Sequence, residues 1–143
     1  MRGLLDVNVL IALLDSGHSC HGLAMRWLED EIAHGWASCP LTQNGCVRIM
    51  SHSSYPGALP ATQVASRLGE AASGQDHEFW ADDISLVEAE HIEWSRVLGS
   101  RQVTDVYLLA LAVQHGGRLV TLDRRIPLAA VSSARPEHLV VIS

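Results

Sequence analysis

The sequence contains no lysine, and all ten of the basic residues among its 143 residues are arginines. Reactions that need an amine side chain, such as P-loop nucleotide hydrolysis and Schiff-base catalysis, are therefore excluded. Arginine pairs with phosphate oxygens through two hydrogen bonds, so the lack of lysine does not exclude a phosphodiester substrate. The formal net charge of -6 argues against a broadly basic surface, so any nucleic acid has to be bound locally.

Cysteine is scarce, and the three cysteines are an odd number without C-x-x-C spacing: Cys20, Cys39 and Cys46. His18 and His21 lie beside the first of them, but the spacing matches no established zinc pattern. No secretory-type segment precedes the first expected strand, and the apolar run at residues 7–14 is too short to cross a bilayer. We therefore expect a cytoplasmic protein with no membrane association.

The length and the hydrophobic content of 48% allow one core, so we expect a single domain over residues 1–143. Short apolar runs alternate with helical patterns along the chain. Strands are expected at residues 3–5, 36–39, 118–122 and 138–142, and helices at 7–14, 20–34, 40–50, 61–72, 85–98 and 104–115. Strands separated by helices favour a mainly parallel sheet with helices on both faces, a three-layer α/β/α sandwich.

Three local patterns support these boundaries. Ser85 to Glu88 has the S-x-x-E form of a capping box, which predicts a helix from there to about residue 98. Thr104 is expected to cap the next helix, whose apolar body at residues 106–113 is covered either by its own domain or by a second subunit. The segment Ser51–Pro60, rich in serine, proline and glycine, should be an irregular loop.

Three aspartates fall where the expected sheet would place them together. Asp6 ends the first strand, Asp123 follows the strand at residues 118–122, and Asp105 lies in the first turn of a helix. Ligands of parallel sheets collect at the carboxyl ends of the strands. Three carboxylates at this edge would repel one another unless a cation neutralised them, and oxygen ligands suit Mg2+ or Mn2+. Such a cation activates water for hydrolysis of a phosphodiester.

Each aspartate also has a purely structural explanation. Asp105 could merely favour the positive end of its helix, and Asp6 and Asp123 could be turn residues that bond to the nearby backbone. Only the convergence of all three favours a metal site. The prediction fails if the three carboxylates lie too far apart to share an ion.

Four blocks of sequence make a resemblance specific: LLDVNVLIALLD at 4–15, CPLTQNGCVRIM at 39–50, VTDVYLLALAVQHGG at 103–117 and RLVTLDRRI at 118–126. In this order they resemble the signature blocks of PIN-domain ribonucleases, the VapC-type toxins of VapBC toxin–antitoxin pairs. The resemblance implies an α/β/α sandwich and divalent-metal hydrolysis of structured RNA such as tRNA or rRNA. It also implies neutralisation by a cognate antitoxin and a homodimer.

Position by position, the resemblance makes the acidic residues the metal ligands and catalytic groups, with polar residues beside them: Asp6, Asp105 and Asp123, then Asn8, Thr104 and Thr121. Gln43 also falls at a site position, where the family usually has glutamate. An amide oxygen can accept a bond but cannot act as a general base. We therefore expect weaker metal binding, and a lower metal requirement after Gln43→Glu.

The arginines nearest these blocks, Arg48, Arg124 and Arg125, are candidates for contacts with RNA phosphates, although a solvated surface role is an equal alternative.

Two other functions compete with that of a metal-dependent ribonuclease. A haloacid-dehalogenase-type phosphatase would need a second aspartate where Asn8 stands, together with a lysine. A catalytically weak or inactive PIN-like module that binds RNA or an antitoxin is favoured by Gln43.

Overall fold

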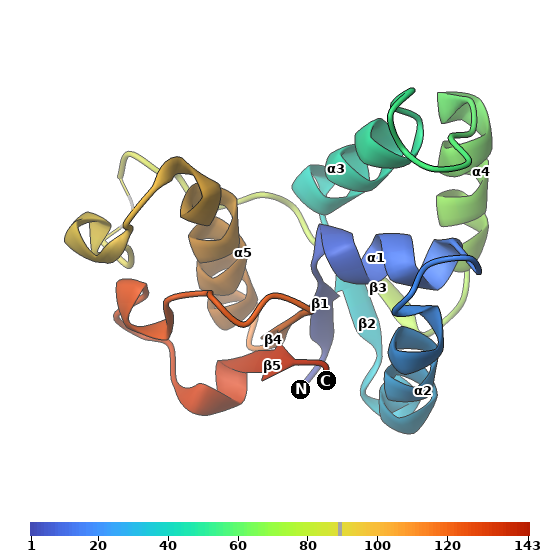
Figure 1. Cartoon of the computed structure of the whole chain (residues 1–143). Helices are drawn as coiled ribbons and strands as arrows, with labels where there is room; N and C mark the ends of the chain where they lie inside the picture. The colour runs from blue at the N-terminus through green and yellow to red at the C-terminus, as the bar shows by residue number, and fades with distance from the viewer. Residues whose placement is uncertain (89) are drawn as a thin grey trace.

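The computed structural model describes residues 1–88 and 90–143, and in them a parallel sheet separates two layers of helices (Figure 1). The strands are β1 (Gly3–Leu5), β2 (Trp36–Ser38), β3 (His77–Phe79), β4 (Arg118–Thr121) and β5 (Leu139–Val141). Their order is β3-β2-β1-β4-β5, and all neighbouring pairs are parallel. The predicted α/β/α sandwich is confirmed.

The helices divide unequally between the two faces. One face carries α1 (Val7–Leu14), α2 (His21–Glu31), α3 (Pro40–Met50) and α4 (Ala61–Ala71), and the other carries α5 (Val103–Gln114) (Figure 1). Each layer has its own buried cluster, and the side chains of β1 alternate between them. Leu4 packs on the α5 side and Leu5 on the α1 side. This alternation is the period-two pattern of a strand buried on both faces.

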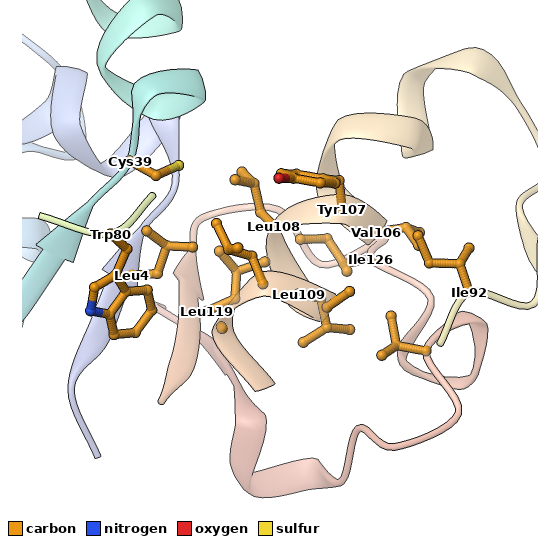
Figure 2. Close-up of a cluster of buried hydrophobic side chains, with 14 of the residues drawn as sticks. Leu4, Cys39, Trp80, Ile92, Val106, Tyr107, Leu108, Leu109, Leu119 and Ile126 are labelled. Atoms are coloured by element: carbon orange, nitrogen blue, oxygen red, sulfur yellow. The ribbon is translucent and has the colours of Figure 1, made fainter. Parts of the chain in front are cut away.

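The apolar helix α5 is covered by its own domain. Its residues from Val106 to Ala112 are all buried. Figure 2 shows Leu108 and Leu109 between Leu4 and Leu119 of the sheet on one side and the C-terminal segments on the other. Burial of each leucine side chain contributes about 1.5–3 kcal/mol, so α5 is anchored firmly. No second subunit is needed to explain its composition.

The helix predicted from Ser85 to residue 98 is wrong for the described part of that range, which excludes residue 89. The Ser85 hydroxyl does accept from the backbone N–H groups of Val87 and Glu88, at 3.3 Å each. The chain there forms turns and a short 3-10 helix at Trp94–Arg96. Val87 is 94% exposed and Leu98 84% exposed, so the apolar residues of this segment do not form one continuous buried face for a helix.

Two smaller differences concern strand and helix starts. The sequence pattern did not predict β3, a three-residue edge strand that pairs with β2 and has an exposed Glu78 and Phe79. The predicted capping role of Thr104 is wrong, because α5 begins at Val103, after a 3-10 turn at Ser100–Gln102. Thr104 is therefore an exposed residue of the first helical turn.

The loop Ser51–Pro60 contains no regular element, as predicted. Its Tyr55 hydroxyl donates to the Asp15 carboxylate at the end of α1, so the loop is tethered to the helical layer. In the described residues no helix has the length and apolar character that a bilayer crossing requires.

Candidate metal centre at the carboxyl edge of the sheet

Asp6 is held rigidly at the point where β1 passes into α1. Its backbone N–H donates to the Val120 carbonyl at 2.9 Å, which continues the pairing of β1 with β4. One carboxylate oxygen, Oδ1, accepts from the Val7 N–H at 2.7 Å and caps α1. The side chain is buried, and this burial raises the pKa of Asp6 against the lowering effect of its hydrogen bonds.

Thr121, at the end of β4, supplies the second contact of Asp6. Its hydroxyl donates to Asp6 Oδ2 at 2.7 Å and accepts from the Asp123 N–H at 3.0 Å. Asn8 Nδ2 also donates to this hydroxyl, at 3.3 Å, while Asn8 Oδ1 accepts from the Leu122 N–H at 3.2 Å. These bonds fix α1 to the end of β4. Asn8 and Thr121 therefore lie beside the acids, where the resemblance places them.

Asp105 reaches the same edge from the opposite helical layer, on the first turn of α5. Its pKa is raised to about 6, first by burial and then by the negative charges of Asp6 and Asp123. Charges influence one another to this extent only when they are near neighbours. Asp105 therefore lies close to Asp6, which follows β1, and to Asp123, which follows β4.

Asp123 is already paired with a cation of the chain itself. Its Oδ1 accepts from the Arg125 backbone N–H at 2.9 Å and from Arg125 Nε at 3.2 Å, and its Oδ2 accepts from Nη2 at 3.5 Å. The Arg125 guanidinium holds the pKa of Asp123 below its ordinary value. Arg124 is exposed and has no hydrogen bond or ion pair with the described residues.

Two hollows meet at Asp105. The first also contains Asp6, Asn8 and Thr104, together with Asn44 and Arg48 of α3. The second is lined by the turn Leu98–Gln102, by Asp123 and by Arg125. The acids therefore lie between two depressions that both carry arginine. Arg101, in the second hollow, was not among the candidates identified from the sequence.

The Gln43 side chain bonds to the end of β2. Its Nε2 donates to the Ser38 hydroxyl at 3.0 Å, and that hydroxyl is 2.7 Å from His77 Nε2. Gln43 is absent from the lining of both hollows, whereas Asn44 lines the first. Adjacent helical residues point about 100° apart, so the face of α3 that carries Asn44 and Arg48 cannot also carry Gln43. Helical spacing from Leu41 would have identified that face.

The donors at this edge suit a hard divalent cation, because they are carboxylate oxygens whose like charges raise the pKa of Asp105. A bound cation would relieve this repulsion. As the side chains lie, however, the described residues contain no group of three His, Cys, Asp or Glu side chains arranged to hold a metal ion. Arg125 already occupies oxygens of Asp123, so one of the three acids is paired with a cation of the chain itself.

A model of the PIN domain family matches residues 3–132. The chain belongs to the PIN-domain family. Among its relatives in Mycobacterium tuberculosis H37Rv, Ribonuclease VapC44 is 46% identical over 99% of this chain and 100% of its own length. Ribonuclease VapC39 is 43% identical over 86% of this chain and 89% of its own, and Ribonuclease VapC38 is 38% identical over 97% and 98%. The resemblance noted in the sequence thus extends over nearly all of this PIN-domain chain.

Proposed function

We propose that this PIN-domain protein is an Mg2+- or Mn2+-dependent endoribonuclease toxin that hydrolyses phosphodiester bonds of structured RNA, such as tRNA or rRNA. The observation that carries the proposal is that Asp105 lines two adjoining hollows, one together with Asp6 and the other together with Asp123. This links three distant segments of the chain in one acidic site. The relatives named as ribonucleases support the choice of substrate.

In this proposal Asp6, Asp105 and Asp123 would hold the cation, which would supply an activated water and would neutralise charge on the phosphate. Thr121 and Asn8 orient the acids through the hydrogen bonds that they make with Asp6 and the end of β4. Burial of Asp6 excludes water from its carboxylate and strengthens its interaction with a cation.

Arginines around the acids are proposed to position the RNA backbone. Arg48 lines the first hollow and Arg125 the second, so phosphates on either side of the scissile bond can each meet a guanidinium. Arg124 is exposed next to the second hollow, where it adds positive charge. This local basic character compensates for the net charge of -6.

We also propose a cognate antitoxin that neutralises the site, a homodimer and a cytoplasmic place of action. The VapC names of the relatives support the antitoxin, and the three free cysteines are compatible with a reducing compartment. The homodimer is supported by the family resemblance alone.

Cleavage of a labelled structured RNA tests the proposal directly. Purified protein is incubated with Mg2+, with Mn2+ or with EDTA, alongside Asp105→Asn and Asp76→Asn. Asp76 is an exposed acid outside both hollows and serves as the matched control. We expect cleavage only with a divalent cation, and a loss of about 100-fold or more in Asp105→Asn alone. Cleavage in EDTA, or full activity of Asp105→Asn, contradicts the proposal.

The second candidate is a PIN-like module that binds RNA or an antitoxin without cutting. It is favoured by the existing contact of Asp123 with Arg125, which occupies oxygens that a cation would need. Under this alternative, the RNA binds but stays intact with every metal ion and at every protein concentration.

A further inference from the structure

Arg125 contacts Asp123 through both its backbone and its side chain. The backbone N–H and Nε approach one carboxylate oxygen at 2.9 and 3.2 Å, and Nη2 approaches the other at 3.5 Å. The guanidinium side chain is 79% exposed and that of Asp123 25% exposed. Arg125 therefore neutralises Asp123 from the solvent side of the acidic site.

This contact competes with metal binding on two grounds. A carboxylate oxygen that accepts two hydrogen bonds has little lone-pair capacity left for a cation. A guanidinium beside Asp123 also repels a doubly charged ion, and its charge acts on Asp105 as well, where it offsets part of the rise in pKa. The other two acids have no arginine or histidine among their hydrogen-bond or ion-pair partners in the described residues.

We propose that Arg125 is an exchangeable counter-ion of the acidic site, which leaves Asp123 when a divalent cation binds and then becomes available to an RNA phosphate. The proposal rests on the proposed function and concerns how its metal site is assembled. It accounts for the fact that the three carboxylates are neighbours without forming a ready metal centre.

The local structure allows the guanidinium to move while the turn stays in place. The Arg125 backbone N–H donates to Asp123, and the Arg125 carbonyl accepts from Gln102 Nε2 at 3.5 Å. The backbone of Arg125 is therefore held by hydrogen bonds of its own. Only an exposed ion pair has to break, and exposed pairs contribute little to stability. Because Arg101 and Ser100 line the same hollow, a released guanidinium would lie near other groups able to donate hydrogen bonds to a phosphate.

Metal binding to the RNA-free protein tests this exchange. Mn2+ affinity is measured by electron paramagnetic resonance of free Mn2+ for the wild type, Arg125→Ala, Arg124→Ala and Asp123→Asn. Arg124→Ala removes the same charge one residue away without touching Asp123, so it is the matched control. We expect the Kd for Mn2+ to fall about two- to five-fold in Arg125→Ala, as suits loss of an exposed ion pair, and to change much less in Arg124→Ala.

A second measurement follows the guanidinium itself. The Arg125 Nε–H signal in NMR spectra, assigned by its loss in Arg125→Ala, should shift during a titration with Mg2+ and saturate together with metal binding. An unchanged signal at metal saturation overturns the proposal, as do equal Mn2+ affinities in the two alanine variants.

These outcomes separate the exchange from the proposed function. If the wild type binds Mn2+, Asp123→Asn does not, and the two arginine variants are alike, the metal site stands and only the exchange is wrong. If the wild type binds no Mn2+ at millimolar concentration, both the exchange and the metal-dependent function are wrong.

Discussion

Replacement of Asp105 by asparagine should stabilise the protein at neutral pH in the presence of EDTA, although Asp105 is proposed to be essential for catalysis. The structure keeps this carboxylate half-buried beside two other acids, and the pKa of Asp105 rises from 3.8 to about 6. Asparagine has nearly the same shape without the charge. The substitution should therefore raise the free energy of unfolding while it removes activity. Functional sites often lower stability in this way.

The magnitude follows from the displacement of the pKa. A rise of about two pKa units corresponds to about 3 kcal/mol, at 1.36 kcal/mol for each unit. Asp105 is only half-buried, and solvent screens its neighbours, so we expect about 1 kcal/mol in the free energy of unfolding. In a chain of this size that gain raises Tm by about 3–5 °C.

The direction of the pKa change decides how the stability depends on pH. The pKa of Asp105 is higher in the folded than in the unfolded protein, so folding favours the protonated carboxyl. The resulting stability is fully present below about pH 4 and is lost as the pH rises through about 6. Urea unfolding in EDTA should therefore show wild type and Asp105→Asn alike near pH 4, and the variant more stable at pH 7.5.

Two results would refute this reasoning. Equal stability of wild type and Asp105→Asn at pH 7.5 would mean that neither burial nor the neighbouring acids destabilise the charged Asp105 carboxylate. An equal gain in Asp76→Asn, which removes an exposed acid, would mean that the effect comes from the net charge of the chain. Addition of Mg2+ should reverse the order by stabilising the wild type more than the variant, since a ligand that binds only the native state stabilises it.

Three further changes test individual contacts. Thr121→Val removes the hydroxyl that donates to Asp6, so we expect roughly tenfold weaker Mn2+ binding by calorimetry, and unchanged affinity would contradict the orienting role. Gly45→Ala places a methyl group 2.7 Å from an α1 side chain and should cost about 1–3 kcal/mol in urea unfolding; no cost would show that α1 and α3 pack loosely. Asn44→Asp should lower the Mn2+ concentration for half-maximal cleavage, whereas Gln43→Glu should leave it unchanged, because only Asn44 lines the hollow beside Asp6.

The alternation of strands and helices could be predicted from the sequence, because the buried parallel strands and α5 are nearly continuous apolar runs. The positions of Asp6 and Asp123 followed from one rule, that ligands lie at the carboxyl ends of parallel strands. To predict the position of Asp105, it was also necessary to infer that α5 begins at the carboxyl edge of the sheet. These predictions depend on local sequence and on general topology, so they required no knowledge of side-chain contacts.

Features that depend on tertiary contacts were not predictable in this way. β3 is three residues long and exists because β2 offers an unpaired edge. The capping pattern at Ser85 forms its local hydrogen bonds, but Val87 and Leu98 after it are exposed, so no continuous buried face stabilises a helix. Gln43 was assigned by similarity of a sequence block, whereas its direction depends on a contact with Ser38 on another element. The pair Arg125–Asp123 competes with a metal in a way that no motif displays.

A crystal structure of the protein soaked with Mn2+ tests the central claim most directly, because anomalous scattering locates the ion without reference to activity. We predict a peak coordinated by oxygens of Asp6, Asp105 and Asp123. A saturated crystal without a peak at this edge of the sheet, or with Mn2+ bound by other acids instead, would contradict the account.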